Sequence, residues 1–279
     1  MTIWVGTRTG GGLVGDEQAR VSVLDHGFTV ADGVFETLKA TPAGAFALTR
    51  HLRRLRDSSL VMGLPEPDAD VIRSAVTDVL ADAALAADEV GRLRITYTAG
   101  AGPLGSDRGH AEPTLVIALA RTQPWPDTTT LATVPWTRNE RSAVAGVKST
   151  SYAENVVALA RAHYSGASEA VLANSRDELC EGTGSNVFVV LDGQLVTPPL
   201  SSGCLAGITR ELVLEWFGAE ERVVPYAALF EADEVMITSS TRDVHPVVRV
   251  DERSWPGPGP VAAHLRAAFT ARAIQDIDP

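Results

Sequence analysis

The stretch Ala145-Gly146-Val147-Lys148-Ser149-Thr150-Ser151-Tyr152-Ala153-Glu154-Asn155 contains one of only two lysines in a chain with 24 lysines and arginines. The other is Lys39. An ammonium group shifts its pKa readily when it loses water, whereas a guanidinium stays charged in proteins. A lysine kept between Val147 and small hydroxylated residues indicates a site where a removable proton matters, as for a Schiff-base nucleophile. The alternative is an ordinary surface lysine.

The composition is that of an ordinary globular protein. The chain has 279 residues, 45% hydrophobic and 21% charged, which suits one large domain or two modest ones. A net charge of −11 and a pI of about 5.0 argue against nucleic acid or an anionic membrane as the main partner. Cys180 and Cys204 form no CxxC motif, so we expect a reduced, cytoplasmic setting. The sequence shows no signal peptide, no membrane span and no histidine motif of metal enzymes.

Hydrophobic periodicity predicts two domains. The first contains helices that begin near residues 49 and 68, and strands at 21–24, 34–39, 92–98 and 114–120. Gln123-Pro124-Trp125-Pro126-Asp127 is the best boundary. We therefore predict an N-terminal domain at 1–120, a linker at 121–130 and a C-terminal domain at 131–279. Strands and helices in the second domain do not alternate regularly, which favours a mixed α+β or barrel-like fold.

Two sites carry complementary chemistry. Lys148 precedes a helical pattern that starts near Ser151, so it lies at a strand-to-helix junction. Glu181 stands before a Gly-Thr-Gly turn that leads into the apolar strand 187–190. A carboxylate in such a place needs a cationic or proton-bearing partner, and a pyridinium N–H would serve. An ordinary turn carboxylate is the alternative.

Two donor-rich turns could bind a phosphate. Gly207, Ile208 and Thr209 open an amphipathic helix, whose N-terminal N–H groups attract anions. The run Thr238-Ser239-Ser240-Thr241 follows a core strand and offers four hydroxyls. Each signal is weak alone, because many helices and polar loops look alike.

Taken together, these motifs resemble a known family in order and spacing. The resemblance is to the class IV aminotransferases, which depend on pyridoxal phosphate, and it covers nearly the whole chain. This family includes branched-chain and D-amino acid aminotransferases, (R)-amine transaminases and 4-amino-4-deoxychorismate lyase. The matching segments are Asp25-His26-Gly27-Phe28, Asp32-Gly33-Val34-Phe35-Glu36, His51-Leu52-Arg53-Arg54-Leu55, Lys148, Glu181-Gly182-Thr183-Gly184-Ser185-Asn186-Val187-Phe188, Gly207-Ile208-Thr209-Arg210 and Ser239-Ser240-Thr241.

The resemblance implies a fold and a set of roles. The fold would be α+β (α/β in some schemes), of fold type IV, with an N-terminal α/β sandwich domain and a C-terminal pseudo-barrel domain that carries the lysine. Lys148 would form the Schiff base and move protons, and Glu181 would face the pyridine nitrogen. Small amino and keto acids would be the substrates of a homodimer with its active site near the subunit interface. The expected phosphate ligands are Arg54, Ile208, Thr209 and Ser240.

The substrate is the open point. Branched-chain members have Asn-Tyr where this chain has Tyr152-Ala153, and D-amino acid members have a tyrosine where it has Phe35. Arg108-Gly109-His110 has the Arg-x-His form that holds the substrate carboxylate in D-amino acid enzymes, and Arg94 is the other candidate. We predict an aminotransferase acting on a D-amino acid and an α-keto acid by a ping-pong mechanism. The alternatives are 4-amino-4-deoxychorismate lyase of the folate pathway, which forms 4-aminobenzoate and pyruvate, and a non-catalytic protein that binds pyridoxal phosphate.

Overall fold

A computed structural model describes all of residues 1–279 and divides into two compact units. Unit 1 comprises Met1–Pro124, Val147–Ser151 and Asp276–Pro279, and unit 2 comprises Trp125–Gly146 and Tyr152–Gln275. The chain first changes unit after Pro124, within the segment predicted as a linker. Lys148 belongs to unit 1, which differs from the predicted division, because its segment pairs with a strand there.

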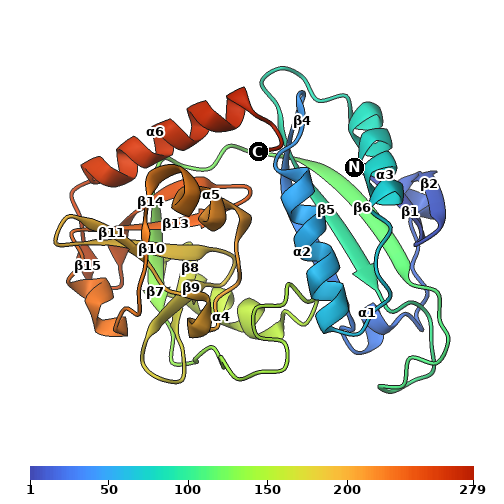
Figure 1. The fold of residues 1–279 in the computed structure, drawn as a ribbon, viewed down its shortest axis with the longest axis horizontal. Coiled ribbons are helices and arrows are strands. Elements are labelled where there is room, and N and C mark those ends of the chain that lie inside the picture. Colours follow the sequence, from blue (N-terminus) through green and yellow to red (C-terminus); the bar gives the residue numbers. More distant parts are fainter. The chain divides into compact units, whose positions relative to one another are not determined.

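Unit 1 is built on a six-stranded antiparallel sheet in the order β2-β1-β6-β5-β3-β4 (Figure 1). Its strands are β1 (Thr2–Thr7), β2 (Gly10–Val14), β3 (Gly33–Thr41), β4 (Gly44–Ala45), β5 (Val90–Thr98) and β6 (Thr114–Thr122). Its helices are α1 (His26–Thr29), α2 (Leu48–Val61) and α3 (Ala69–Ala83), with a 3-10 turn at Asp16–Gln18.

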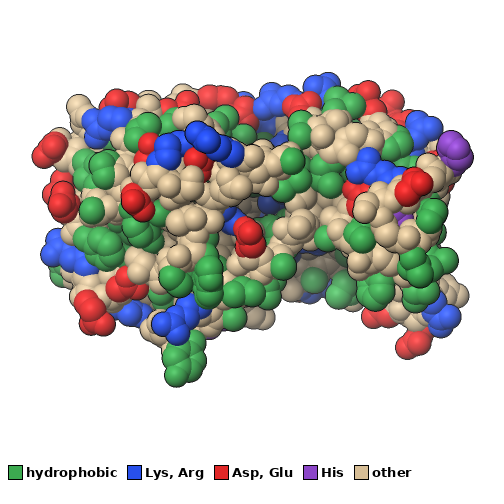
Figure 2. All heavy atoms as spheres, turned by 90° about the horizontal axis from the view of Figure 1, so that it is seen from below, with side chains coloured by type: hydrophobic (Ala, Val, Ile, Leu, Met, Phe, Trp, Pro, Cys, Tyr) green, Lys and Arg blue, Asp and Glu red, His purple; other side chains and the backbone are tan.

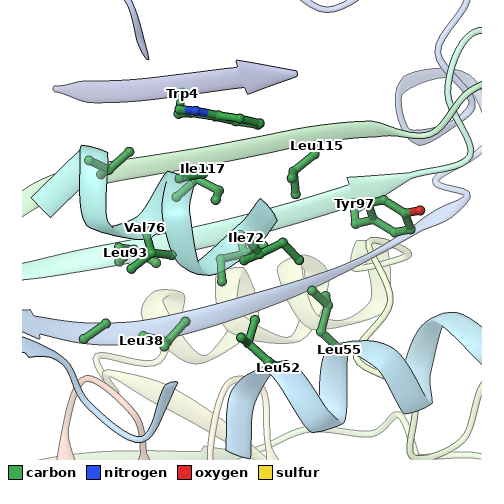
Figure 3. Packing of buried hydrophobic residues seen from close by; sticks show 14 of the residues in the cluster. Trp4, Leu38, Leu52, Leu55, Ile72, Val76, Leu93, Tyr97, Leu115 and Ile117 are labelled. Atoms are coloured by element: carbon green, nitrogen blue, oxygen red, sulfur yellow. The ribbon is translucent and has the colours of Figure 1, made fainter. Parts of the chain in front are cut away.

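The core of unit 1 lies between this sheet and the helices α2 and α3. β5 alternates strictly, with Leu93 and Ile95 buried and the intervening arginines exposed. Leu55 from α2 and Ile72 from α3 pack against the buried face of the sheet, as Figure 3 shows for side chains of both layers. Each such side chain contributes about 1.5–3 kcal/mol when it leaves water. The period-two pattern of β5 thus decides which face is covered and leaves the arginines on the other.

The predicted strand at 21–24 is wrong. Val21, Val23 and Leu24 are exposed and have no strand beside them. The edge of the sheet is formed instead by β1 and β2, which the sequence did not predict. β2 begins with three glycines, whose strand propensity is low, and it exists because it pairs with β1 from Gly10 to Val14. The presence of a partner strand, and not local propensity, therefore decides both cases: residues 21–24 have no partner strand, whereas β2 pairs with β1.

The lysine segment is fixed by hydrogen bonds to the start of β3. Phe35 donates its N–H to the carbonyl of Lys148 at 2.9 Å, and Thr150 donates its N–H to the carbonyl of Gly33 at 2.8 Å. Val34 and Ser149 form an antiparallel bridge between these bonds. The segment around Lys148, predicted as a strand-to-helix junction, thus pairs with the start of β3 like a short extra strand.

Unit 2 contains a nine-stranded sheet whose central strands close into a barrel. The path runs β12-β11-β10-β13-β14-β7-β8-β9, and β15 pairs with β14. Glu181 of β9 also pairs with Asn186 of β10, so the strands β10-β13-β14-β7-β8-β9 form a ring. The strands are β7 (Thr129–Thr133), β8 (Glu169–Ala173), β9 (Leu179–Gly182), β10 (Asn186–Leu191), β11 (Gln194–Thr197), β12 (Glu220–Glu221), β13 (Glu234–Ser239), β14 (Asp243–Val250) and β15 (Arg253–Ser254).

Helices pack on the outside of this barrel. They are α4 (Ala153–Tyr164), α5 (Ile208–Phe217) and α6 (Pro260–Gln275), with 3-10 turns at Leu200–Ser202 and Tyr226–Phe230. α6 lies along β13 and β14, and α4 lies on β7 and β8 (Figure 1). β10 is buried from Asn186 to Val190, and its Val187 and Val189 belong to the apolar core of unit 2. The predicted α+β class and barrel-like domain are confirmed.

The surface carries mixed charge. Figure 2 shows one face of the molecule, on which acidic and basic side chains are interspersed rather than gathered by sign. No helix combines the length and the apolar character that crossing a bilayer requires. No three histidine, cysteine or acidic side chains come together in a way that could hold a metal ion.

Candidate active site

The predicted nucleophile Lys148 lies against an aromatic ring that also contacts an arginine. Lys148 Nζ is 4.5 Å from the centroid of the Phe35 ring, and Arg94 Cζ is 3.8 Å from the same centroid. Phe35 comes from β3 and Arg94 from the adjacent β5, where Arg94 Nε donates to Thr96 Oγ1 at 3.2 Å. A cation is attracted by the negative face of an aromatic ring. Phe35 therefore brings an amine and a guanidinium together on one small surface of unit 1.

A buried ionic cluster lies behind this surface. Glu36 is fully buried and accepts hydrogen bonds from Arg54 Nε at 2.8 Å, Arg54 Nη2 at 2.6 Å and His51 Nδ1 at 2.6 Å. Burial raises the pKa of the Glu36 carboxyl, but the attraction of Arg54 and His51 outweighs it and lowers the pKa from 4.5 to about 2. Burial lowers the pKa of His51, and Glu36 offsets this only in part. At neutral pH the cluster is thus an ionised carboxylate between a guanidinium and a neutral imidazole.

One face of α2 presents this cluster to the lysine. His51, Arg54 and Ser58 recur at helical spacing, so they lie along the same side of the helix. Ser58 Oγ accepts the backbone N–H of Lys148 at 3.4 Å. Lys148 is therefore positioned from two sides, by β3 through its carbonyl and by α2 through its N–H.

Arg108 makes several hydrogen bonds within unit 1. Its Nε and Nη2 bind both oxygens of Asp32 at 2.5 and 2.6 Å, and it also donates to the carbonyls of Met62 and Gly63. The Arg108 guanidinium thus links its loop to Asp32 and to the end of α2. His110 is exposed at the surface. Arg94, Arg108 and His110 stay the predicted candidates for the substrate carboxylate, and Arg94 is the one that lies over the Phe35 ring.

In unit 2, Glu181 is a buried carboxylate at the closure of the barrel. Its Oε1 accepts from Arg138 Nε at 3.0 Å, and its Oε2 accepts from the backbone N–H of Leu205 at 2.9 Å. Pairing with Asn186 fixes its backbone. Two donors orient the Glu181 carboxylate, which suits an acceptor for a ring N–H.

The N-terminus of α5 suits an anion. Its N-cap is Gly207, and no side chain caps the first N–H groups of the helix. A Cβ at residue 207 would lie 1.9 Å from Asn186 Oδ1, so only glycine allows the close approach. Ile208 and Thr209 are the first helical residues, and both are buried. The half-buried Ser240 lies separately, in the turn between β13 and β14.

Sequence reasoning assigned no role to several residues that hold these groups. His51 stands three residues before Arg54, the expected phosphate ligand, which is a detectable helical signal, and Glu36 ends the segment Asp32-Gly33-Val34-Phe35-Glu36 that resembles the family. Arg138 had no local signal, because it is 43 residues from Glu181. Tyr152 also becomes informative: its hydroxyl donates to the Thr183 carbonyl at 3.1 Å, and burial raises its pKa.

The predicted residues are divided between the two units. Unit 1 holds Phe35, Arg54, Arg94 and Lys148, and unit 2 holds Glu181, Ile208, Thr209 and Ser240. The donor sets fit pyridoxal phosphate: an amine can react with its aldehyde, a fixed carboxylate can accept its ring N–H, and an uncapped helix N-terminus can bind its phosphate.

The comparisons with known proteins agree with this chemistry. The family described as Amino-transferase class IV matches residues 33–250. A protein of Methanocaldococcus jannaschii, provisionally named a branched-chain-amino-acid aminotransferase, is 34% identical over 87% of this chain and 87% of its own length. The D-alanine aminotransferase of Staphylococcus haemolyticus is 29% identical over 93% of this chain and 94% of its own. The solved structure of a fold IV transaminase from Curtobacterium pusillum has a TM-score of 0.87 and 29% identity, covering 97% of this chain and 99% of that one.

The substitution Glu36→Gln tests the buried cluster through its pH dependence. Because the pKa of Glu36 is lowered from 4.5 to about 2, its stabilising effect is complete above pH 4.5 and is lost as the pH falls towards 2. Urea unfolding at neutral pH should show a loss of about 3 kcal/mol in the variant. At about pH 3 the difference in unfolding free energy between wild type and Glu36→Gln should be smaller. The exposed Glu66→Gln is the control, and an equal loss at both pH values would contradict the assignment.

Proposed function

This chain belongs to the class IV aminotransferases, which use pyridoxal phosphate, and we propose that it transfers the amino group of a D-amino acid to an α-keto acid. The observation that carries the proposal is the placement of Arg94 and Lys148 over the Phe35 ring. A guanidinium fork matches a carboxylate in geometry and charge. An α-amino acid can thus be held by its carboxylate at Arg94 while its nitrogen reacts near Lys148.

Two observations support the D-enantiomer. The similarity to the D-alanine aminotransferase extends over 93% of this chain. Tyr152-Ala153 also departs from the Asn-Tyr pattern of branched-chain members, and the Tyr152 hydroxyl is engaged with Thr183. A branched-chain L-amino acid is the second candidate, favoured by the 34% identity to the Methanocaldococcus jannaschii protein.

We assign each residue a part in this reaction. Pyridoxal phosphate supplies an aldehyde that condenses with amines and a ring that withdraws electrons from the α-carbon. Lys148 would provide the amine that holds the cofactor, and it would take and return the substrate α-proton. Glu181 would accept the N–H of the ring nitrogen. Arg54, the backbone of Ile208 and Thr209, and Ser240 would bind the phosphate.

We also propose a homodimer. Gly102 donates its N–H to the carbonyl of Leu24 at 3.1 Å, which joins the loop bearing Leu104 to the segment before α1. This region exposes a group of large apolar side chains, which a second copy would cover. They are Val21, Val23, Leu24, Phe28, Val30 and Leu104. The segment leads directly into β3, so the partner would approach the strand that bears Phe35.

Replacing Lys148 tests the nucleophile. In Lys148→Ala the absorbance of covalently held cofactor should disappear, and turnover should fall by at least about 100-fold because the proton carrier is lost. The backbone contacts of residue 148 do not need its side chain, so thermal stability of the apoprotein should change little. Lys39→Ala, which removes the other lysine, should keep both signals. Borohydride reduction followed by peptide mapping should place the label on residue 148, and a label on residue 39 would refute the assignment.

A spectral half-reaction screen tests the substrate class. The holoenzyme is mixed with D- and L-amino acids, with (R)-amines and with aminodeoxychorismate, and the loss of the cofactor band is followed. We expect D-alanine or D-glutamate to react. In Arg94→Leu their rates should fall roughly 10- to 100-fold, because a hydrogen bond to a charged group contributes about 1.5–3 kcal/mol.

The neighbouring Arg92→Leu serves as the matched control, since it removes a cation from the same face of β5 two residues away. Amines without a carboxylate should react equally with wild type and Arg94→Leu. Release of 4-aminobenzoate without any reaction of D-amino acids would establish the lyase instead. Reaction with L-leucine alone would favour the branched-chain candidate.

The substitution Phe28→Glu tests the dimer. Phe28 is 77% exposed in one chain, so a charge there costs nothing in the monomer but would be buried in the dimer. Sedimentation should show wild type at twice the 29.5 kDa chain mass and the variant at the chain mass. Tyr164→Glu, which is 86% exposed in unit 2, should leave the dimer intact. A monomeric wild type would exclude the proposal.

A further inference from the structure

A second buried carboxylate of unit 2 lies beneath the turn that follows Glu181. Glu169 is the first residue of β8 and is 2% exposed. Its Oε1 accepts from the backbone N–H of Gly184 at 2.8 Å and from Ser185 Oγ at 2.7 Å. A Cβ at residue 182 would lie 2.6 Å from the same oxygen, so the turn is closed tightly over the carboxylate. Glu169 thus fixes the conformation of residues 182–185.

The other oxygen of Glu169 faces an arginine from a distant turn. Arg242 Nη1 lies 3.0 Å from Glu169 Oε2, and the N–H does not point at the oxygen well enough for a hydrogen bond, so the contact is ionic. Arg242 Cζ stacks 4.1 Å from the centroid of the Trp125 ring. The backbone N–H of Arg242 donates to the carbonyl of Ser239 at 3.2 Å, which closes the turn that carries Ser240.

We propose that Glu169 and Arg242 are positioning residues, whose buried ion pair locks the 182–185 turn to the 239–243 turn. This inference rests on the proposed function, in which Glu181 directly precedes the first turn and Ser240 lies within the second. Neither Glu169 nor Arg242 needs to touch the cofactor. They act by holding, in one fixed geometry, a contact to its ring nitrogen and a contact to its phosphate.

The charge of the pair is essential to this role. An ionised carboxylate that is 2% exposed is costly unless a cation or several donors compensate it. Without Arg242, Glu169 would keep its two bonds to residues 184 and 185 but lose the only cation that faces it. Without the charge of Glu169, Arg242 would retain only the Trp125 face. The backbones beside the two turns already pair between Asn186 and Thr238, and the ion pair adds a side-chain contact between the turns themselves.

The test compares Glu169→Gln, Arg242→Met and the double variant. Glutamine keeps the shape of the side chain and an oxygen for Gly184 and Ser185, and methionine keeps the apolar stem against Trp125. Each apoprotein is titrated with pyridoxal phosphate to give its Kd, and its melting temperature is measured separately. We expect each single variant to raise the Kd about tenfold and the double variant to raise it no further, because both remove one interaction.

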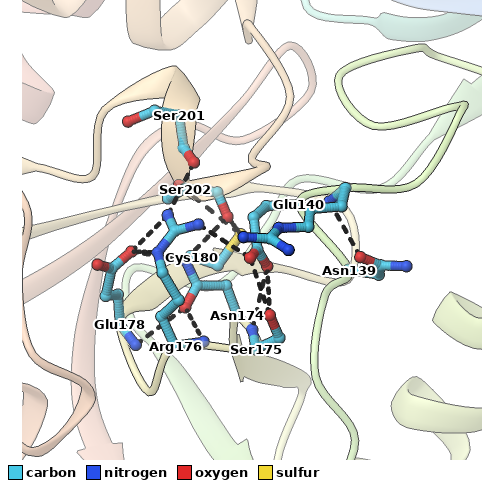
Figure 4. A network of polar contacts seen from close by, with 10 residues as sticks. Asn139, Glu140, Asn174, Ser175, Arg176, Glu178, Cys180, Ser201 and Ser202 are labelled. Carbon is cyan, nitrogen blue, oxygen red and sulfur yellow. Dashed lines mark hydrogen bonds and ion pairs between the residues drawn. The ribbon is translucent and has the colours of Figure 1, made fainter.

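Two further variants separate positioning from general stability. Arg242→Lys keeps the charge and should restore most of the affinity. Arg176→Met removes a comparable ionic network of unit 2, in which Arg176 bridges Glu140 and Glu178 (Figure 4), and it does not touch either turn. It should lower the melting temperature and leave the Kd unchanged. In the holoenzymes, kcat should fall for Glu169→Gln and Arg242→Met, with the KM for the amino donor unchanged.

The outcomes are distinguishable. If Glu169→Gln and Arg242→Met lower the melting temperature but bind pyridoxal phosphate as wild type does, the pair is only a structural brace and the inference is overturned. If the effects of the two substitutions add in the double variant, the residues act separately and the coupling between the turns is refuted. If wild type itself does not bind pyridoxal phosphate, the proposed function fails first.

Discussion

The cost of burying a carboxylate is the constraint that organises this protein. Glu36, Glu169 and Glu181 are each less than a tenth exposed, and an unpaired charge in such a place would cost several kcal/mol. Every one of them therefore collects donors: an arginine in each case, joined by a histidine, by backbone N–H groups or by a hydroxyl. Because each carboxylate accepts from several directions, it fixes the segments that supply the donors. The chemistry of both units is built on these fixed segments.

The chain has only two lysines, and its buried carboxylates are paired with arginines instead. A guanidinium stays charged when it is buried beside a carboxylate, so Arg54, Arg138 and Arg242 can hold structure without exchanging protons. His51 is kept neutral by its burial despite the adjacent Glu36. The cations and the imidazole around the site are thus fixed in one protonation state. Lys148 differs from these groups in type, since an ammonium shifts its pKa readily when it loses water and a guanidinium does not.

Sequence patterns identified the chemical groups better than their partners. Composition, turn residues and apolar periodicity mark Lys148, Glu181 and the start of α5 locally, so the sequence singles them out as candidates, and their roles stay predictions. The ion pair between Arg108 and Asp32 could not be predicted, because the two residues are 76 positions apart and sequence spacing does not indicate a contact at that range. The same holds for β2, whose glycines disfavour a strand until β1 pairs with it. Lys148 was expected in the C-terminal domain because it follows the predicted linker at 121–130, but its segment pairs with the start of β3 and belongs to unit 1.

Within unit 2, Asn186 links the carboxylate of Glu181 to the segment that leads into α5. Its backbone pairs with Glu181 where the barrel closes. Its side-chain amide donates to the Leu205 carbonyl at 2.8 Å, and its Oδ1 occupies the space in which any side chain at residue 207 would lie. Leu205 in turn donates its N–H to Glu181. Contacts among Glu181, Asn186 and Leu205 therefore fix the distance from Glu181 to the first turn of α5. The strand register that closes the barrel thus also sets the spacing between this carboxylate and the start of the helix.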